Sequence, residues 1–264
     1  MRIVTLLSDF GLQDHYVAAM KGVILSINPD VNIIDITHMI APHDVMSAAF
    51  VLGQSFSCFP PGTVHVAVVD PGVGTSRKAL VASAAREFFL APDNGILSYV
   101  AQSSEDFVAH EITADHYFRK PVSSTFHGRD IFAPVAAYIS KGIHLEKFGP
   151  VLEKPMQLPI PMLQRLKDSL IQAAILAVDH FGNAITNLRA EDLPVYETEN
   201  ARRCEVLVKQ RKIDSFRRTF GEGQPGEIFV VPGSSGYLEI VMCEGSAASE
   251  LNLKPGDAVK AVLL

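Results

Sequence analysis

Three aspartates follow short apolar segments that have the character of β-strands. Asp9 ends "IVTLLSD", Asp70 ends "HVAVVD", and Asp93 ends "FFLAPD"; each has a glycine within the next two residues. Asp and Gly are common turn formers, so each acid taken alone could serve only its turn. Ligands of parallel α/β sheets bind outside the carboxyl ends of the strands. Three acids at such ends therefore predict a shared polar pocket.

Two further side chains could act with these acids on a water molecule. Arg77 follows Asp70 after a turn rich in glycine, and His127 lies in "STFHGRDIF" at the start of an expected helix. A guanidinium carries a permanent positive charge, and an imidazole titrates near neutrality. His127 could also serve only as a capping or packing residue. We expect Arg129 and Asp130 to pair or cap locally.

Two segments in the later part of the chain, which we expect to form the second domain, have the composition of a binding site for a planar heterocycle. "DHFGNAITN" (179–187) places Phe181 and Asn183 after an acid, and "GSSGYLEI" (233–240) adds a serine-rich turn. Aromatic rings beside amide and hydroxyl groups suit a flat base. Such turns are equally common in β-barrels.

Several familiar sites are absent from the sequence. "PGVGTSRK" lacks the GxxxxGK[ST] spacing of a phosphate loop, and no GxSxG element indicates a serine hydrolase. His38, His43 and Asp44 cluster without a recognised metal-ligand pattern. We therefore expect neither a metal nor a cofactor.

The first part of the chain alternates strand and helix patterns. Strands are expected at 3–9, 31–37, 65–69, 79–84 and 88–92, and helices at 15–27, 44–56 and 129–142, with Asp44 as a helix N-cap. This alternation predicts an α/β domain with a largely parallel sheet over residues 1–160.

A different pattern follows a proline-rich stretch at 149–163. Short strand-like segments separated by Gly, Asp and Ser fill residues 161–264, which favours a small antiparallel barrel or sandwich. The sequence thus predicts two domains, 1–160 and 161–264.

Composition restricts the class of protein. The 264 residues are 48% hydrophobic with a net charge of −6, which is typical of a folded protein and gives no basic footprint for nucleic acid. No apolar run reaches the roughly 20 residues of a membrane span. Three cysteines far apart in the chain, Cys58, Cys204 and Cys243, favour a cytoplasmic location.

Taken in order, seven segments resemble one family across nearly the whole chain. They are "SDFGLQDHYV", "DITH", "VVDPGVGTSR", "PDNG", "TFHGRDIFAPVAA", "DHFGNAITN" and "GSSGYLEI". The chain resembles the S-adenosylmethionine hydrolases that form adenosine, also called SAM hydroxide adenosyltransferases, which are relatives of fluorinase and chlorinase. The resemblance implies an α/β N-terminal domain and a C-terminal β-barrel.

The resemblance also implies a reaction and its catalytic residues. Water or hydroxide attacks ribose C5′ and displaces the methionine sulfur, and the three residues that handle the water match Asp70, Arg77 and His127. The halogenating relatives lack the Asp and the His and carry an inserted loop, for which the stretch from Arg77 to Pro92 leaves no room. Our hypothesis is that Asp70 and His127 order the water while Arg77 stabilises its hydroxide form; which residue takes the proton stays open.

Substrate-binding residues follow from the same resemblance. Asp9 corresponds to the acid that binds the ribose hydroxyls, and Asp14 and Asp179 to those that hold the methionine ammonium. The remaining matches are Phe181 and Phe220 for stacking on adenine, Asn183 beside it, Ser234 for the methionine carboxylate, and Glu239 and Met242 elsewhere in the substrate site. Two arginines of the halogenases are replaced here, by Ser235 and near Met242.

The resemblance further implies a homotrimer, with each site between the first domain of one subunit and the second domain of its neighbour. Two other functions stay open at this point. One is a halogenase-like enzyme that uses S-adenosylmethionine, and the other is a non-catalytic protein that binds S-adenosylmethionine or adenosine.

Overall fold

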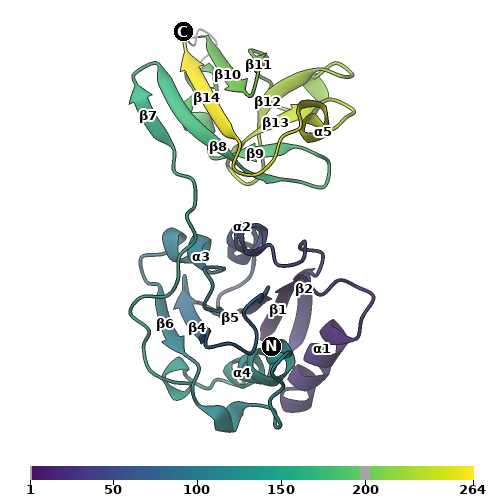
Figure 1. The fold of residues 1–264 in the computed structure, drawn as a ribbon, viewed down its shortest axis with the longest axis vertical. Helices are drawn as coiled ribbons and strands as arrows, with labels where there is room; N and C mark the ends of the chain where they lie inside the picture. Colours follow the sequence, from purple (N-terminus) through teal and green to yellow (C-terminus); the bar gives the residue numbers. More distant parts are fainter. Residues whose placement is uncertain (1, 197–202) are drawn as a thin grey trace. The chain divides into compact units, whose positions relative to one another are not determined.

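The computed structural model describes residues 2–196 and 203–264 (Figure 1). The chain forms two compact units, Met1–Pro159 and Ile160–Leu264. We call them the first and the second unit.

The first unit is built on a mixed sheet of six strands, counted over its described residues 2–159. In the order in which they pair, the strands are β2 (Asn32–Thr37), β1 (Ile3–Ser8), β3 (Val64–Val68), β5 (Glu87–Pro92), β4 (Ala79–Ala84) and β6 (Val108–Glu111). Strands β2, β1, β3 and β5 run parallel to one another, and β4 pairs antiparallel with both β5 and β6. The predicted α/β domain with a largely parallel sheet is confirmed.

Helices pack on both faces of this sheet (Figure 1). Helix α1 (Tyr16–Ile27) pairs with α4 (Ala133–Ser140), and α2 (Val45–Ser55) pairs with α3 (Ser98–Ser103). Val4 and Leu6 of β1 pack in the core that α1 and α4 cover. They lie on the same face of the sheet because side chains alternate between the two faces along a strand. In the described part of the chain, no helix has the length and apolar character needed to cross a membrane.

Two details of the first unit differ from the sequence prediction. Strand β6 and helix α3 were not expected; both are short, and their local patterns are weak. The helix expected at 129–142 begins with a π-helical turn, Gly128–Phe132, before α4. Such wide turns are frequent at functional sites.

The second unit is an antiparallel barrel-like sheet. Its described residues form eight strands: β7 (Gln164–Lys167), β8 (Leu170–Val178), β9 (Ala184–Thr186), β10 (Cys204–Val208), β11 (Arg211–Ile213), β12 (Ile228–Pro232), β13 (Leu238–Met242) and β14 (Ala258–Leu263). A short helix, α5 (Ala247–Leu251), packs on β13. Buried and partly exposed residues alternate along β10, as in a sheet with one face toward a core. The predicted C-terminal antiparallel barrel is confirmed.

Candidate active site

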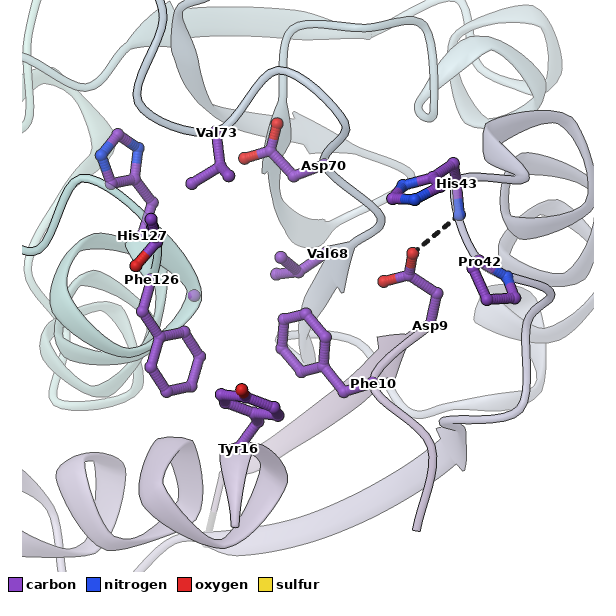
Figure 2. A pocket seen from close by; sticks show the side chains of 12 residues that line it. Asp9, Phe10, Tyr16, Pro42, His43, Val68, Asp70, Val73, Phe126 and His127 are labelled. Atoms are coloured by element: carbon purple, nitrogen blue, oxygen red, sulfur yellow. Dashed lines mark hydrogen bonds between the residues drawn. The ribbon is translucent and has the colours of Figure 1, made fainter. Parts of the chain in front are cut away.

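A cavity of about 290 Å³ lies at the carboxyl ends of β1 and β3 in the first unit (Figure 2). These strands are parallel neighbours, and Ser8 pairs with Val68. Asp9 and Asp70 follow those two residues closely, so both carboxylates line the same cavity. Two of the three acids predicted to share a pocket therefore do so.

Asp93 and Asp14 lie outside this group. The Asp93 carboxylate accepts a hydrogen bond of 2.7 Å from the Met156 backbone N–H, so this acid holds a neighbouring segment and does not line the cavity. Including Asp93 in the shared pocket was wrong, because a strand end does not fix where the following loop turns. Asp14 is exposed on the loop before α1 and does not line the cavity either.

Asp70, Arg77 and His127 form one hydrogen-bonded group although His127 is 50 residues from Arg77 in sequence. Arg77 Nε lies 2.9 and 3.0 Å from the two Asp70 carboxylate oxygens, and Arg77 Nη2 also donates to Asp70 Oδ2. Arg77 Nη2 lies 2.8 Å from His127 Nδ1. Asp70 and His127 line the cavity, whereas Arg77 is not among its lining residues and links the two.

The hydrogen bond from Arg77 fixes the protonation pattern of His127. A guanidinium only donates, so His127 Nδ1 must accept, and the neutral ring carries its proton on Nε2. Burial, followed by the charge of Arg77, lowers the pKa of His127, while Asp70 and Asp130 act in the opposite direction. The hydrogen bond from Arg77 and the lowered pKa both favour the neutral form of His127.

The backbones of the two loops that carry Arg77 and His127 lie very close to each other. Gly74, between Asp70 and Arg77, has a φ of +76°, and a side chain there would meet the Ser124 carbonyl oxygen at 2.2 Å. Only glycine combines that backbone conformation with that contact. Gly74 therefore lets the loop after β3 lie against the loop that leads to His127.

A buried carboxylate anchors the segment around His127. Asp130 accepts hydrogen bonds from Arg129 at 2.7 and 2.8 Å, from Arg119 at 3.2 Å and from the Ser123 backbone at 2.9 Å. The expected local pairing of Arg129 with Asp130 is confirmed. These bonds hold both ends of the segment that presents His127.

His43 is a cavity residue that sequence reasoning considered only as a possible metal ligand. Its backbone N–H donates to Asp9 Oδ2 at 2.9 Å (Figure 2), and its φ is +69°, a strained value for a residue other than glycine. The neighbouring Asp44 caps α2 by accepting from the Ser47 N–H at 3.0 Å, as predicted. No local sequence signal distinguishes His43 from a loop residue.

Three aromatic rings line the same cavity and were also missed. Phe126 lies edge-to-face against Phe10 and Tyr16, with ring centroids 5.8 and 5.2 Å apart. In Figure 2, Phe10 and Tyr16 lie below the cavity and Asp70 and the His127 ring above it. The cavity thus has a polar end and an aromatic end.

The second unit has a larger cavity, of about 630 Å³. Every candidate binding residue predicted in this part of the chain lines it: Asp179, Phe181, Asn183, Phe220, Ser234, Glu239 and Met242. Phe181 is 75% exposed and Phe220 52% exposed, which is unusual for large apolar side chains and indicates a binding surface.

The turn after β8 shapes this cavity. Asp179 accepts from the backbone N–H groups of Phe181 and Asn183 at 2.9 and 2.8 Å, and from the Asn183 side chain at 2.9 Å. The acid therefore makes its turn, and it also orients the Asn183 amide. Burial, followed by the charge of Asp179, raises the pKa of Glu239 nearby.

Comparisons with family models and with known proteins point to the same family. Residues 4–149 match the model of the SAM hydroxide adenosyltransferase N-terminal domain, and residues 173–260 match that of the C-terminal domain. The chain is 38% identical to an (R)-S-adenosyl-L-methionine hydrolase of Salinispora tropica, over 97% of this chain and 96% of that protein. It is 27% identical to a fluorinase of Nocardia brasiliensis, over 98% and 96%.

A solved structure agrees with these relationships. An uncharacterized conserved protein from Thermotoga maritima superposes with a TM-score of 0.91 and 38% identity, over 98% of this chain and 99% of that one. Together these matches span nearly the full length of both units. The chain belongs to the SAM hydroxide adenosyltransferase family.

Proposed function

We propose that the protein hydrolyses S-adenosylmethionine to adenosine and methionine by attack of water on ribose C5′. The observation that carries this proposal is the linked group of Asp70, Arg77 and His127 at the edge of a cavity. Relatives named (R)-S-adenosyl-L-methionine hydrolase, 33–38% identical over nearly the full chain, support it.

The chemistry needs an activated nucleophile and no acid at the leaving group. The new bond joins the water oxygen to C5′, the C5′–S bond breaks, and its electron pair stays on sulfur. The sulfonium leaves as a neutral thioether, and the water gives up one proton. Asp70 and His127 face the cavity and order the water, whose proton Asp70 can accept because a carboxylate has free lone pairs beyond its bonds to Arg77.

Arg77 acts through its hydrogen bonds to these two residues and not by lining the cavity. Its charge favours the hydroxide form of the water, and its N–H group keeps His127 Nδ1 an acceptor, so that His127 Nε2–H can donate a hydrogen bond to the water oxygen. Positioning of well-aligned reactants can lower the activation free energy of such a displacement by about 7–11 kcal/mol.

In-line attack places the leaving sulfur on the side of C5′ away from the water. With the water at Asp70 and His127, the sulfonium lies toward Phe10 and Tyr16 (Figure 2). Aromatic faces attract cations, so this end of the cavity suits the positive sulfur.

The rest of the substrate is divided between the two cavities. We assign the ribose hydroxyls to Asp9, the methionine ammonium to Asp14 and Asp179, and its carboxylate to Ser234. Adenine stacks between Phe181 and Phe220, and Asn183, Glu239 and Met242 complete that side of the site. We further propose a homotrimer in which the first unit of one subunit and the second unit of its neighbour make each site, a cytoplasmic location, and no cofactor.

One observation favours hydrolysis over halogenation. Strands β4 and β5 are joined by only Ala85 and Arg86, both with positive φ, as in a two-residue hairpin turn. The halogenases carry an inserted loop in the region after the arginine. A purely binding protein would have no need for an acid, a guanidinium and an imidazole around one water.

The test is incubation of the purified protein with S-adenosylmethionine, followed by chromatography. We expect equal amounts of adenosine and methionine. Formation of a 5′-halogenated nucleoside when chloride or fluoride is added would instead show a halogenase. Binding without product would leave only the non-catalytic function.

A further inference from the structure

Behind Asp9 lies a buried chain of polar groups that the proposed reaction does not use. His38, the last residue of "DITH", is 3% exposed, and Ser8, the last residue of β1, is 1% exposed. Ser8 Oγ lies 2.7 Å from His38 Nδ1. Ser8 immediately precedes Asp9, so this contact joins the end of β1 to the loop after β2.

The protons of this chain can be assigned from its partners. His38 Nε2 lies 3.1 Å from Asp35 Oδ1, a close contact that is not aligned as a hydrogen bond. Burial alone would raise the pKa of Asp35, but Lys21 at 2.6 Å and His38 outweigh it and lower that pKa. A carboxylate at this place favours a proton on Nε2, so Nδ1 accepts from the Ser8 hydroxyl.

The Ser8 hydroxyl oxygen makes a second hydrogen bond, to the backbone just after Asp9. It accepts from the Phe10 backbone N–H at 3.3 Å. The His38 carbonyl accepts from the Gly11 N–H at 2.8 Å, so side chain and backbone of His38 both hold the turn that contains Asp9. The same loop supplies the His43 N–H that binds the Asp9 carboxylate.

This serine, histidine and aspartate have the order of a hydrolytic triad, but their burial excludes that role. Ser8 is closed to substrate, so its hydroxyl cannot act as a nucleophile. What the chain can do is fix the backbone on both sides of Asp9. We propose that His38, acting through Ser8, is a positioning residue that sets the Asp9 carboxylate for the two ribose hydroxyls; this rests on the ribose role of Asp9 in the proposed function.

A second chain of the same kind provides a matched control. Thr5, also on β1, lies 2.7 Å from His65 Nδ1, and His65 Nε2 lies 2.5 Å from Glu87 Oε2. All three residues are buried, and none lines the cavity. Loss of this hydroxyl removes an equivalent buried hydrogen bond from the same strand without touching the Asp9 turn.

The experiment measures the preference of the full-length protein for adenosine over 2′-deoxyadenosine by titration calorimetry. Ser8→Ala and His38→Asn are compared with Thr5→Val, and thermal unfolding is recorded for each. Because one hydrogen bond contributes about 0.5–1.5 kcal/mol, we expect Ser8→Ala to lower the preference roughly 2- to 10-fold. Thr5→Val should lower the melting temperature and leave the preference at the wild-type value.

Each outcome bears on the proposal. Folded Ser8→Ala and His38→Asn proteins with the wild-type preference would overturn it, as would an equal loss in Thr5→Val. Asp9→Asn should abolish the preference, and adding Ser8→Ala to it should cause no further loss. An unchanged preference in Asp9→Asn would refute the ribose role and the positioning together. Failure to release adenosine from S-adenosylmethionine, with the preference intact, would refute the proposed reaction and leave the positioning supported.

Discussion

The two cavities differ in how far their side chains are already held in place. In the first unit, Asp70, Arg77 and His127 hold one another by short hydrogen bonds, and the Asp70 and Arg77 side chains are only 6% and 10% exposed. In the second unit, Phe181 and Phe220 are exposed rings. Catalytic side chains stabilise a transition state best when they are already fixed before the reaction. Exposed apolar rings instead contribute to the free energy of binding when the ligand covers them. The comparison predicts effects on kcat from the linked Asp70, Arg77 and His127 of the first cavity, and on KM from the aromatic rings of the second.

The largest effect is expected for Asp70→Asn. The amide keeps the shape of the side chain but cannot take the proton of the water, so kcat for adenosine release should fall by about 10²–10⁴. Binding of S-adenosylmethionine, measured by calorimetry, should change little. A wild-type kcat in a folded Asp70→Asn protein would contradict the role of the first cavity.

The pH dependence of kcat tests the link between Arg77 and His127. The mechanism uses neutral His127, and the pKa of this residue is lowered. We therefore expect kcat to fall only at a pH below the ordinary histidine pKa, where His127 becomes protonated. Arg77→Met removes a charge that lowers this pKa, so the acidic limb should move to higher pH. The limb should disappear in His127→Asn. An acidic limb that persists in His127→Asn would assign it to another group.

A smaller effect is expected for Phe181→Ala in the second cavity. Stacking of a base on an aromatic ring contributes about 1–3 kcal/mol, so KM should rise at least roughly fivefold with little change in kcat. Phe181→Tyr keeps the ring and should behave like the wild type. A fall in kcat alone would break the division between the two cavities.

The smallest effect is expected for Phe10→Leu. Loss of one ring face beside the sulfonium should weaken S-adenosylmethionine binding about 2- to 10-fold and leave binding of S-adenosylhomocysteine, a neutral thioether, unchanged. Because the positive charge on sulfur decreases in the transition state, kcat should not fall. Equal losses for both ligands would mean that Phe10 only packs in the cavity.

Local sequence patterns were sufficient for the fold class and for part of the site. The strands that precede Asp9 and Asp70 were recognised from their apolar runs, and parallel neighbours bring their ends to one edge. The same argument failed for Asp93, whose side chain holds the segment at Met156. A pattern locates the end of a strand, but the loop beyond it depends on distant contacts.

The amino-acid order by itself determined the alternation of strands and helices in the first unit, the short strands of the second, and the residue types available for chemistry. These follow from periodicity and turn chemistry, which act over a few residues. Only the tertiary structure decided that Arg77 joins Asp70 to His127, that Phe10, Tyr16 and His43 line the cavity, and that His38 lies behind Asp9. Apart from the local pair of Asp70 and Arg77, those contacts join segments about 30 or more residues apart, and packing of the whole sheet and its helices brings them together.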